Sequence, residues 1–331
     1  MSDLLLCVYT FGRNGSNYFF HLAAIAAFLL PHFLLKEFMQ SRQLKLIHLV
    51  TILCLVVFAF STRSIASQKD GLLKVYFFDI GQGDSIFIEA PNGNQVLVDG
   101  GPDNSVLQKL GEAMPFYDKD IDLVVLSHPH LDHYNRLIEV LNRYDVANIM
   151  EAREEPKEKA LSAGFSAWRE TVKKENANEI EPIAGKVIDL GNGAELIVLH
   201  PFESVAGDRP SNVHDDVVVA MLRYGEFEVL LTGDMEEKVE RRLILAQEDL
   251  DSDILKVGHH GSKTSSSEAF LAAVSPEAAV ISVGAKNRYG HPTQEVLKRL
   301  EDYGIKYYRN DTDGDIQVIS DGENYQIFSS K

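Results

Sequence analysis

A segment that directly follows an apolar, β-branched run carries side chains able to bind metal ions at close spacing. They are His128, His130, Asp132 and His133. Because the preceding run, 121–126, has the composition of a buried strand, these side chains should converge at the end of that strand. Residues two apart in an extended loop point the same way, so His128 and His130 are expected at one ion, and Asp132 and His133 at a second. The spacing predicts two divalent metals side by side.

Later segments add candidate ligands of the same chemical types. His214 lies in a polar loop directly before the apolar run 217–222, and Asp234 ends another apolar run in a Gly-Asp pair. A carboxylate exposed at the end of a strand can bridge two cations. His259 and His260 follow a further short apolar run, far enough after Asp234 to leave room for one helix and a returning strand.

The elements that must position these residues follow from the pattern of apolar residues and turns. An antiparallel meander is expected to open a sandwich over 74–80, 85–88 and 95–98. A hairpin across Gly191-Asn192-Gly193 should start a second sheet, and strands 306–309 and 315–319 should close it. Helices are predicted over 104–112, 236–250 and 293–303, with one peripheral amphipathic helix within 151–184.

The N-terminal region differs from the rest of the 331-residue chain. Two transmembrane helices are predicted, Phe19–Leu35 and Leu46–Phe60, and the basic loop between them should face the cytoplasm. The prediction is a membrane-anchoring region over 1–68 and a domain over 69–331 that carries the candidate metal ligands and faces the outside of a bacterial cytoplasmic membrane. A late signal sequence is the alternative, but it would exceed about 60 residues, well above the usual length.

Charge and cysteine content narrow the class of protein. The formal net charge of −17 excludes a nucleic-acid binder that works through an overall basic face. It does not exclude a nuclease, because bound divalent metals supply positive charge at the cleavage site. The two cysteines, Cys7 and Cys54, both lie in the apolar N-terminal region and form no disulfide framework.

The HxHxDH pattern at 128–133 resembles the signature of the metallo-β-lactamase fold, which implies an α+β protein built as an αββα sandwich. An ordered set of further motifs resembles the C-terminal metallo-β-lactamase domain of the ComEC competence-protein family, from about Leu73 to the C-terminus. They are FDIGQGDS at 78–85, DGG at 99–101, LLTGD at 230–234, HHGSKTS at 259–265 and NRYGHP at 287–292.

This resemblance implies an extracytoplasmic nuclease that degrades one strand of incoming DNA while a membrane channel passes the other. The family carries a large multi-helix channel domain, whereas two helices are predicted here, so a separate DNA-channel subunit is an expected partner. The family usually has Asp at the position of His130, and His130 restores the fuller ligand set. The family also usually has a Gly pair where Asn135 and Arg136 stand. Arg136 and Tyr134, in place of small residues, are expected to add bulk near the pocket rim.

The resulting hypothesis is a metal-dependent phosphodiesterase that uses two divalent ions, Zn or Mn, to activate a hydroxide. One ion is assigned to His128, His130 and His214, the other to Asp132, His133 and His259, with Asp234 as the bridge. The assigned catalytic residues are Asp132, His260, Lys263 and His291. Lys263 is expected to hold a phosphate, and His260 and His291 are expected to donate a proton or to orient ligands.

Three questions stay open at this point. His260 or His291 can replace His259 as the last ligand. The substrate can be DNA, or it can be a small-molecule or cell-wall phosphoester. A non-catalytic assembly factor for DNA uptake, in which metals serve folding alone, is the third alternative.

Overall fold

The computed structural model describes residues 46–56, 71–152, 159–208, 210 and 212–331. The chain divides into two compact units, Met1–Gln68 and Lys69–Lys331. In the first unit, residues 46–56 form a helix whose apolar side chains are exposed, Leu49 to 67%. Among the described residues, no helix combines the length and the apolar character needed to cross a membrane. The first predicted transmembrane helix and the end of the second lie outside the described residues, so both stay predictions.

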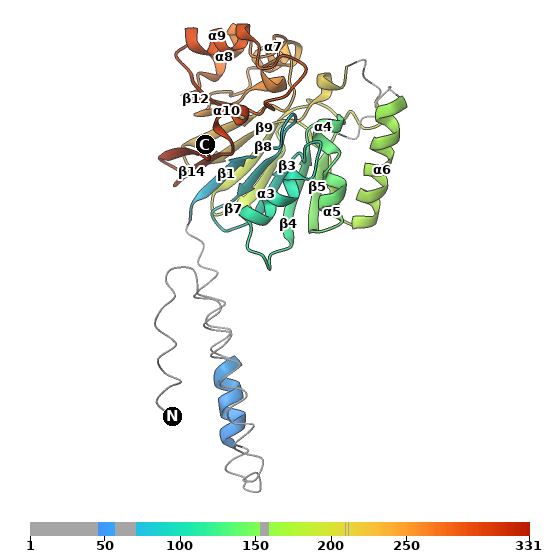
Figure 1. The fold of residues 1–331 in the computed structure, drawn as a ribbon, viewed down its shortest axis with the longest axis vertical. Coiled ribbons are helices and arrows are strands. Elements are labelled where there is room, and N and C mark those ends of the chain that lie inside the picture. The colour runs from blue at the N-terminus through green and yellow to red at the C-terminus, as the bar shows by residue number, and fades with distance from the viewer. Residues whose placement is uncertain (1–45, 57–70, 153–158, 209, 211) are drawn as a thin grey trace. The chain divides into compact units, whose positions relative to one another are not determined.

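The second unit is built on two sheets, which Figure 1 shows between helices on either side. In spatial order, the strands of the first sheet are β15 (Tyr325–Ser329), β14 (Ile316–Ser320), β1 (Leu73–Phe77), β2 (Ile86–Glu89), β3 (Gln95–Val98), β4 (Asp120–Leu126), β5 (Asp145–Glu151) and β6 (Asn178–Ile180). Those of the second are β13 (Lys306–Arg309), β12 (Ala278–Ile281), β11 (Ile254–Lys256), β10 (Phe227–Leu231), β9 (Val219–Tyr224), β8 (Ala194–His200) and β7 (Val187–Gly191).

Helices cover the outer faces of both sheets. On the first sheet lie α3 (Ser105–Ala113), α4 (Leu131–Tyr134), α5 (Leu137–Leu141) and α6 (Lys159–Glu175). On the second lie α7 (Glu237–Ala246), α8 (Glu268–Val274) and α9 (Gln294–Asp302). The short elements are η2 (Val213–Asp216), η3 (Gly258–Gly261) and α10 (Asn310–Asp313). Apolar clusters lie between the two sheets and under each helix layer, which confirms the predicted αββα sandwich.

One strand lies in a different sheet from the one expected. Strand 306–309 does join the second sheet, but β14 pairs antiparallel with β1 in the first, with Leu73 opposite Ser320. Its side chains Ile316 and Val318 are fully buried between the sheets. The chain changes sheets at α10, where the Asn310 side chain donates to the backbone oxygens of Phe77 and Gly314.

The segment expected to be one peripheral helix is α6 followed by the edge strand β6. Trp168 of α6 is fully buried, and its Nε1 donates to Glu151 Oε2 at 2.5 Å. Tyr134 is buried as well, with its ring 5.9 Å from that of Phe165. Gly164 allows this approach, because a Cβ there would lie 2.4 Å from the Tyr134 hydroxyl. Tyr134 therefore belongs to the core under α6, which corrects its expected place at the pocket rim.

Candidate metal centre

The candidate ligands lie where neighbouring strands end. Strands β3 and β4 are parallel, and so are β10, β11 and β12, so their carboxyl ends meet at common edges. The loop after β4 carries the HxHxDH residues, Asp234 follows β10, and η3 with His259 and His260 follows β11. Gly83 lets the 81–84 loop pack against this site, since a Cβ there would lie 2.3 Å from the Asp132 backbone oxygen.

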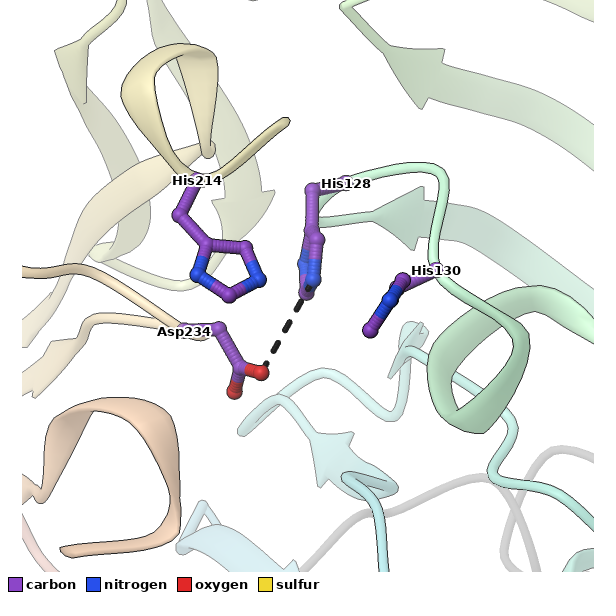
Figure 2. A group of neighbouring side chains, drawn as sticks. All are labelled: His128, His130, His214 and Asp234. Carbon is purple, nitrogen blue, oxygen red and sulfur yellow. Dashed lines mark ion pairs between the residues drawn. The ribbon is translucent and has the colours of Figure 1, made fainter. Parts of the chain in front are cut away.

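One group of ligand atoms comes from the loop after β4, from η2 and from Asp234. Figure 2 shows the three imidazoles around the Asp234 carboxylate. The group consists of His128, His130, His214 and Asp234. Each of them offers one ligand atom, and these atoms all lie within 4.8 Å of one another. His128 Nε2 is 3.8 Å from Asp234 Oδ2. These are the residues assigned from the sequence to the first ion and its bridge.

A second group consists of Asp132, His133 and His260. His260 Nε2 lies 3.7 Å from Asp132 Oδ2 and 3.5 Å from Asp234 Oδ1. His133 Nε2 lies 3.4 Å from Asp234 Oδ2. The Asp234 carboxylate therefore faces both groups, as a bridging ligand must.

In this second group the structure has His260 where the ligand set from the sequence had His259. Both histidines have left-handed backbone angles, with φ 45° at His259 and 53° at His260, and the chain turns sharply between them. His260 is buried, and its Nδ1 donates to the Ser282 backbone oxygen at 2.8 Å. His259 instead lies with His214 and Glu236, its Nδ1 3.3 Å from Glu236 Oε1.

Hydrogen bonds to the far side of each ring select the tautomer that a metal requires. His133 Nδ1 donates to Asp99 Oδ2 at 2.7 Å, and His128 Nδ1 lies 3.0 Å from Ser127 Oγ. Ser127 Oγ itself donates to Asp99 Oδ2, so it accepts from His128. With Nδ1 protonated at His128, His133 and His260, each Nε2 offers a lone pair toward the cluster.

The charges of the cluster shift the pKa values of its histidines in opposite directions, and Asp234 raises the pKa of His260 against the effect of burial. Burial, followed by the nearby His133, lowers the pKa of His128 well below its usual range, and burial lowers that of His259 to about 4. Burial alone would raise the pKa of Asp234, but His260 and His133 hold it well below its usual value. Burial would lower the pKa of His133, yet Asp234 and Asp99 raise it overall. A metal binding at His133 would therefore release a proton.

These residues pass a simple test of fit for divalent metals. Buried polar atoms are normally hydrogen-bonded. Among the described residues, however, Asp234 Oδ1 and the Nε2 atoms of His128, His133 and His260 have no hydrogen-bond partner. All four atoms belong to residues of the two ligand groups. Imidazole nitrogen together with carboxylate oxygen is a donor set suited to Zn or Mn. The residues fit metal ions, and a polar core without metals would leave these atoms unsatisfied.

The other residues singled out from the sequence lie around this cluster. Lys263 is exposed in the turn after η3, and His291 is half-buried with its ring 5.7 Å from that of His259. Neither belongs to a ligand group of the described residues. His200, at the end of β8, is buried, and its Nδ1 donates to the Val217 backbone oxygen at 2.8 Å, which gives it a structural role. Burial lowers its pKa to about 4, so its ring stays neutral.

Sequence reasoning missed several residues that support the ligands. Asp99 accepts hydrogen bonds from the Ser127 backbone, the Ser127 hydroxyl and His133, and its place at the end of β3 before Gly-Gly was the available signal. Glu236 accepts from Asn212 and Thr264 between His214 and His259, and its pKa falls to about 2, first through the nearby His214 ring. No local signal marks Glu236 as more than a residue at the start of a helix.

A buried ion pair underlies the cluster. Lys256 Nζ lies 2.9 Å from Asp84 Oδ2 and donates to the Val257 backbone oxygen at 2.9 Å, and both side chains are almost completely buried. Asp84 Oδ1 lies 3.5 Å from His260 Nδ1. Lys256 thus balances the charge of a carboxylate that lies next to a candidate ligand.

The sandwich and the paired ligand groups at its edge define a metal-dependent hydrolase of the metallo-β-lactamase fold. The chain belongs to the Metallo-beta-lactamase superfamily, whose family model matches residues 78–285. ComE operon protein 3 of Bacillus subtilis (strain 168) is 31% identical over 263 residues, which are 74% of this chain and 32% of that protein. Competence protein ComA of Neisseria gonorrhoeae is 43% identical over 119 residues, 35% of this chain and 17% of that protein.

These relatives confirm the resemblance to the ComEC family. The chain spans about a third of the first relative's length and less of the second's. Among solved structures, Igni18, a metallo hydrolase from Ignicoccus hospitalis KIN4/I, is similar with a TM-score of 0.48 and 15% identity. That similarity covers 78% of this chain and all of the other.

Proposed function

We propose that this chain is a nuclease that hydrolyses phosphodiester bonds of DNA. The observation that carries the proposal is the pair of buried ligand groups with Asp234 between them. When bound, two divalent ions would activate water as the nucleophile and neutralise charge on the phosphoryl oxygens. The relation to proteins named for competence supports DNA as the substrate.

The protein's own side chains would hold the metal ligands in position and supply a proton. Asp99 and Ser127 fix the rings of His133 and His128, and a mispositioned ligand lowers metal affinity and activity. His291 borders the cluster without joining a ligand group, so it remains a candidate donor of a proton to the leaving oxygen. His260, with its Nδ1 bound to Ser282 and its Nε2 facing two carboxylates, is better suited to be a ligand than a proton donor.

Exposed cations in the segments after His259 and before His291 suit a polyanionic substrate. Lys263 follows η3, and Lys286 and Arg288 lie in the loop between β12 and α9. None of the three side chains has an ion pair with another residue in the part of the chain that is described. In a chain of net charge −17, cations without acidic partners in the segments that carry His259 and His291 favour phosphate as the group bound there.

The experiment uses the purified full chain with Mn or Zn, and with EDTA as the control. We expect metal-dependent cleavage of bis(p-nitrophenyl) phosphate and of labelled single-stranded DNA, both abolished when the chelator removes the metal. Hydrolysis of the small ester alone would overturn the nuclease in favour of a phosphoesterase acting on small or cell-wall substrates. Metal binding without hydrolysis of either would favour the non-catalytic assembly factor.

We also propose that the N-terminal region anchors the chain in the cytoplasmic membrane, with the hydrolase domain outside and a separate channel subunit as partner. The exposed apolar side chains of helix 46–56 and the basic loop before it support this placement. In a variant with Cys7 and Cys54 replaced by serine, Ser67→Cys should react with a membrane-impermeant maleimide applied to intact cells. Labelling only after the cells are opened would reverse the proposed topology.

A further inference from the structure

The loop between β12 and α9 is held in a defined shape beside the ligand cluster. The Asn287 side chain donates to the backbone oxygens of Gly284 and His291 at 2.9 and 2.8 Å, and it accepts from the His291 backbone N–H at 3.0 Å. The Asn287 backbone N–H also donates to Gly284 at 3.0 Å. These bonds close the loop on itself. Its end is tied to η3, because the backbone N–H and the hydroxyl of Thr293 donate to the Gly261 backbone oxygen at 2.9 and 3.2 Å.

Tyr289 lies at this tip with its side chain 62% exposed. Its ring is nearly parallel to that of His291, at 13° and 6.0 Å between centroids. The His291 ring in turn lies 5.7 Å from that of His259, which borders the cluster. Neighbouring rings therefore lead from His259 through His291 to the exposed aromatic ring of Tyr289.

The charges around Tyr289 determine what kind of ligand this surface suits. Arg288 precedes Tyr289, and Lys286 lies in the same loop, both exposed and without acidic partners among the described residues. Exposed tyrosines occur elsewhere without such surroundings: Tyr117 lies against Phe116, and Tyr303 ends α9 beside Glu301 and Asp302. An open ring flanked by cations is the combination with which proteins bind single-stranded nucleic acid, stacking a base and contacting its phosphates.

We infer that Tyr289 stacks on an unpaired base of a nucleic-acid strand whose neighbouring phosphate lies at the ligand cluster, with Lys286 and Arg288 contacting adjacent phosphates. This inference rests on the proposed nuclease function, and it adds a preference for single strands. In a duplex the bases are already stacked on one another, so Tyr289 has no free base face to bind.

The test compares the full-length wild-type chain with Tyr289→Ala, Tyr289→Trp and the matched exposed control Tyr303→Ala. The substrates are a labelled thymidine oligonucleotide, an abasic oligonucleotide of equal length and a duplex, in the presence of Mn. Because stacking on one base contributes about 1–3 kcal/mol, Tyr289→Ala should raise the KM for the thymidine oligonucleotide by roughly 5- to 150-fold. Tyr289→Trp should retain the wild-type KM, and Tyr303→Ala should leave it unchanged.

On the abasic strand, Tyr289→Ala and the wild type should differ by less than about twofold, since no base is present to stack. An equal loss on both strands, or equal cleavage of duplex and single strand, would overturn the inference. If the wild type cleaves no oligonucleotide, the proposed function fails. Binding of the same oligonucleotides, measured by fluorescence anisotropy, then tests whether Tyr289 stacks on a base. Base-dependent binding that Tyr289→Ala removes supports the stacking site, and equal binding of both strands contradicts it.

Discussion

Asp234→Asn should reduce the hydrolysis of bis(p-nitrophenyl) phosphate by about a thousandfold or more, because it removes a buried carboxylate that faces both ligand groups. Asp234 is buried, and its oxygens lie 3.4 to 3.8 Å from nitrogens of His128, His133, His259 and His260. The amide keeps the shape of the side chain but not its charge, so bound metal should fall together with the rate. Elemental analysis and steady-state kinetics on the same preparation measure both quantities.

Asp302→Asn is the matched control, since this aspartate ends α9 on the surface and pairs with Lys298. It should retain the metal content and the rate of the wild type. An Asp234→Asn protein that still holds its full metal content and keeps its rate would show that Asp234 is not the bridge. A protein that keeps the metals but loses the rate would mean that the carboxylate acts on the substrate instead.

Lys256→Met should lower the free energy of unfolding by about 3–5 kcal/mol, the range measured when one partner of a buried ion pair is removed. Methionine fills nearly the same volume, so the loss comes from leaving the Asp84 carboxylate buried without its cation. Urea denaturation of the full chain in EDTA measures the change without a contribution from bound metal. Lys298→Met, which breaks an exposed pair on α9, should have a much smaller effect.

The double variant Asp84→Asn, Lys256→Met separates charge from packing. It should recover most of the stability lost in Lys256→Met, because neither group of the pair is then left charged without a partner. If the double variant is as unstable as Lys256→Met alone, the lysine stabilises the fold through its packing, and the argument from charge is wrong.

Most of the candidate site could be predicted because each ligand lies next to a strand whose apolar composition marks it as buried. His128, His130 and Asp132 follow β4 directly, and Asp234 follows β10, so the carboxyl ends of strands indicate where the ligands meet. The same patterning predicted most of the strands and helices, and the resemblance of the HxHxDH motif implied the sandwich. These are local properties, which depend on neighbours a few residues away along the chain.

The sequence by itself determined the chemistry of the site, namely imidazoles and carboxylates at strand ends, and the class of fold that brings strand ends together. Only the tertiary structure decided which of His259 and His260 enters the second group, because two left-handed residues in η3 turn one ring inward and the other toward Glu236. It also decided that β14 pairs with β1 and that Asp84 meets Lys256. Such choices depend on contacts between residues far apart in the chain, and residue spacing carries no information about them.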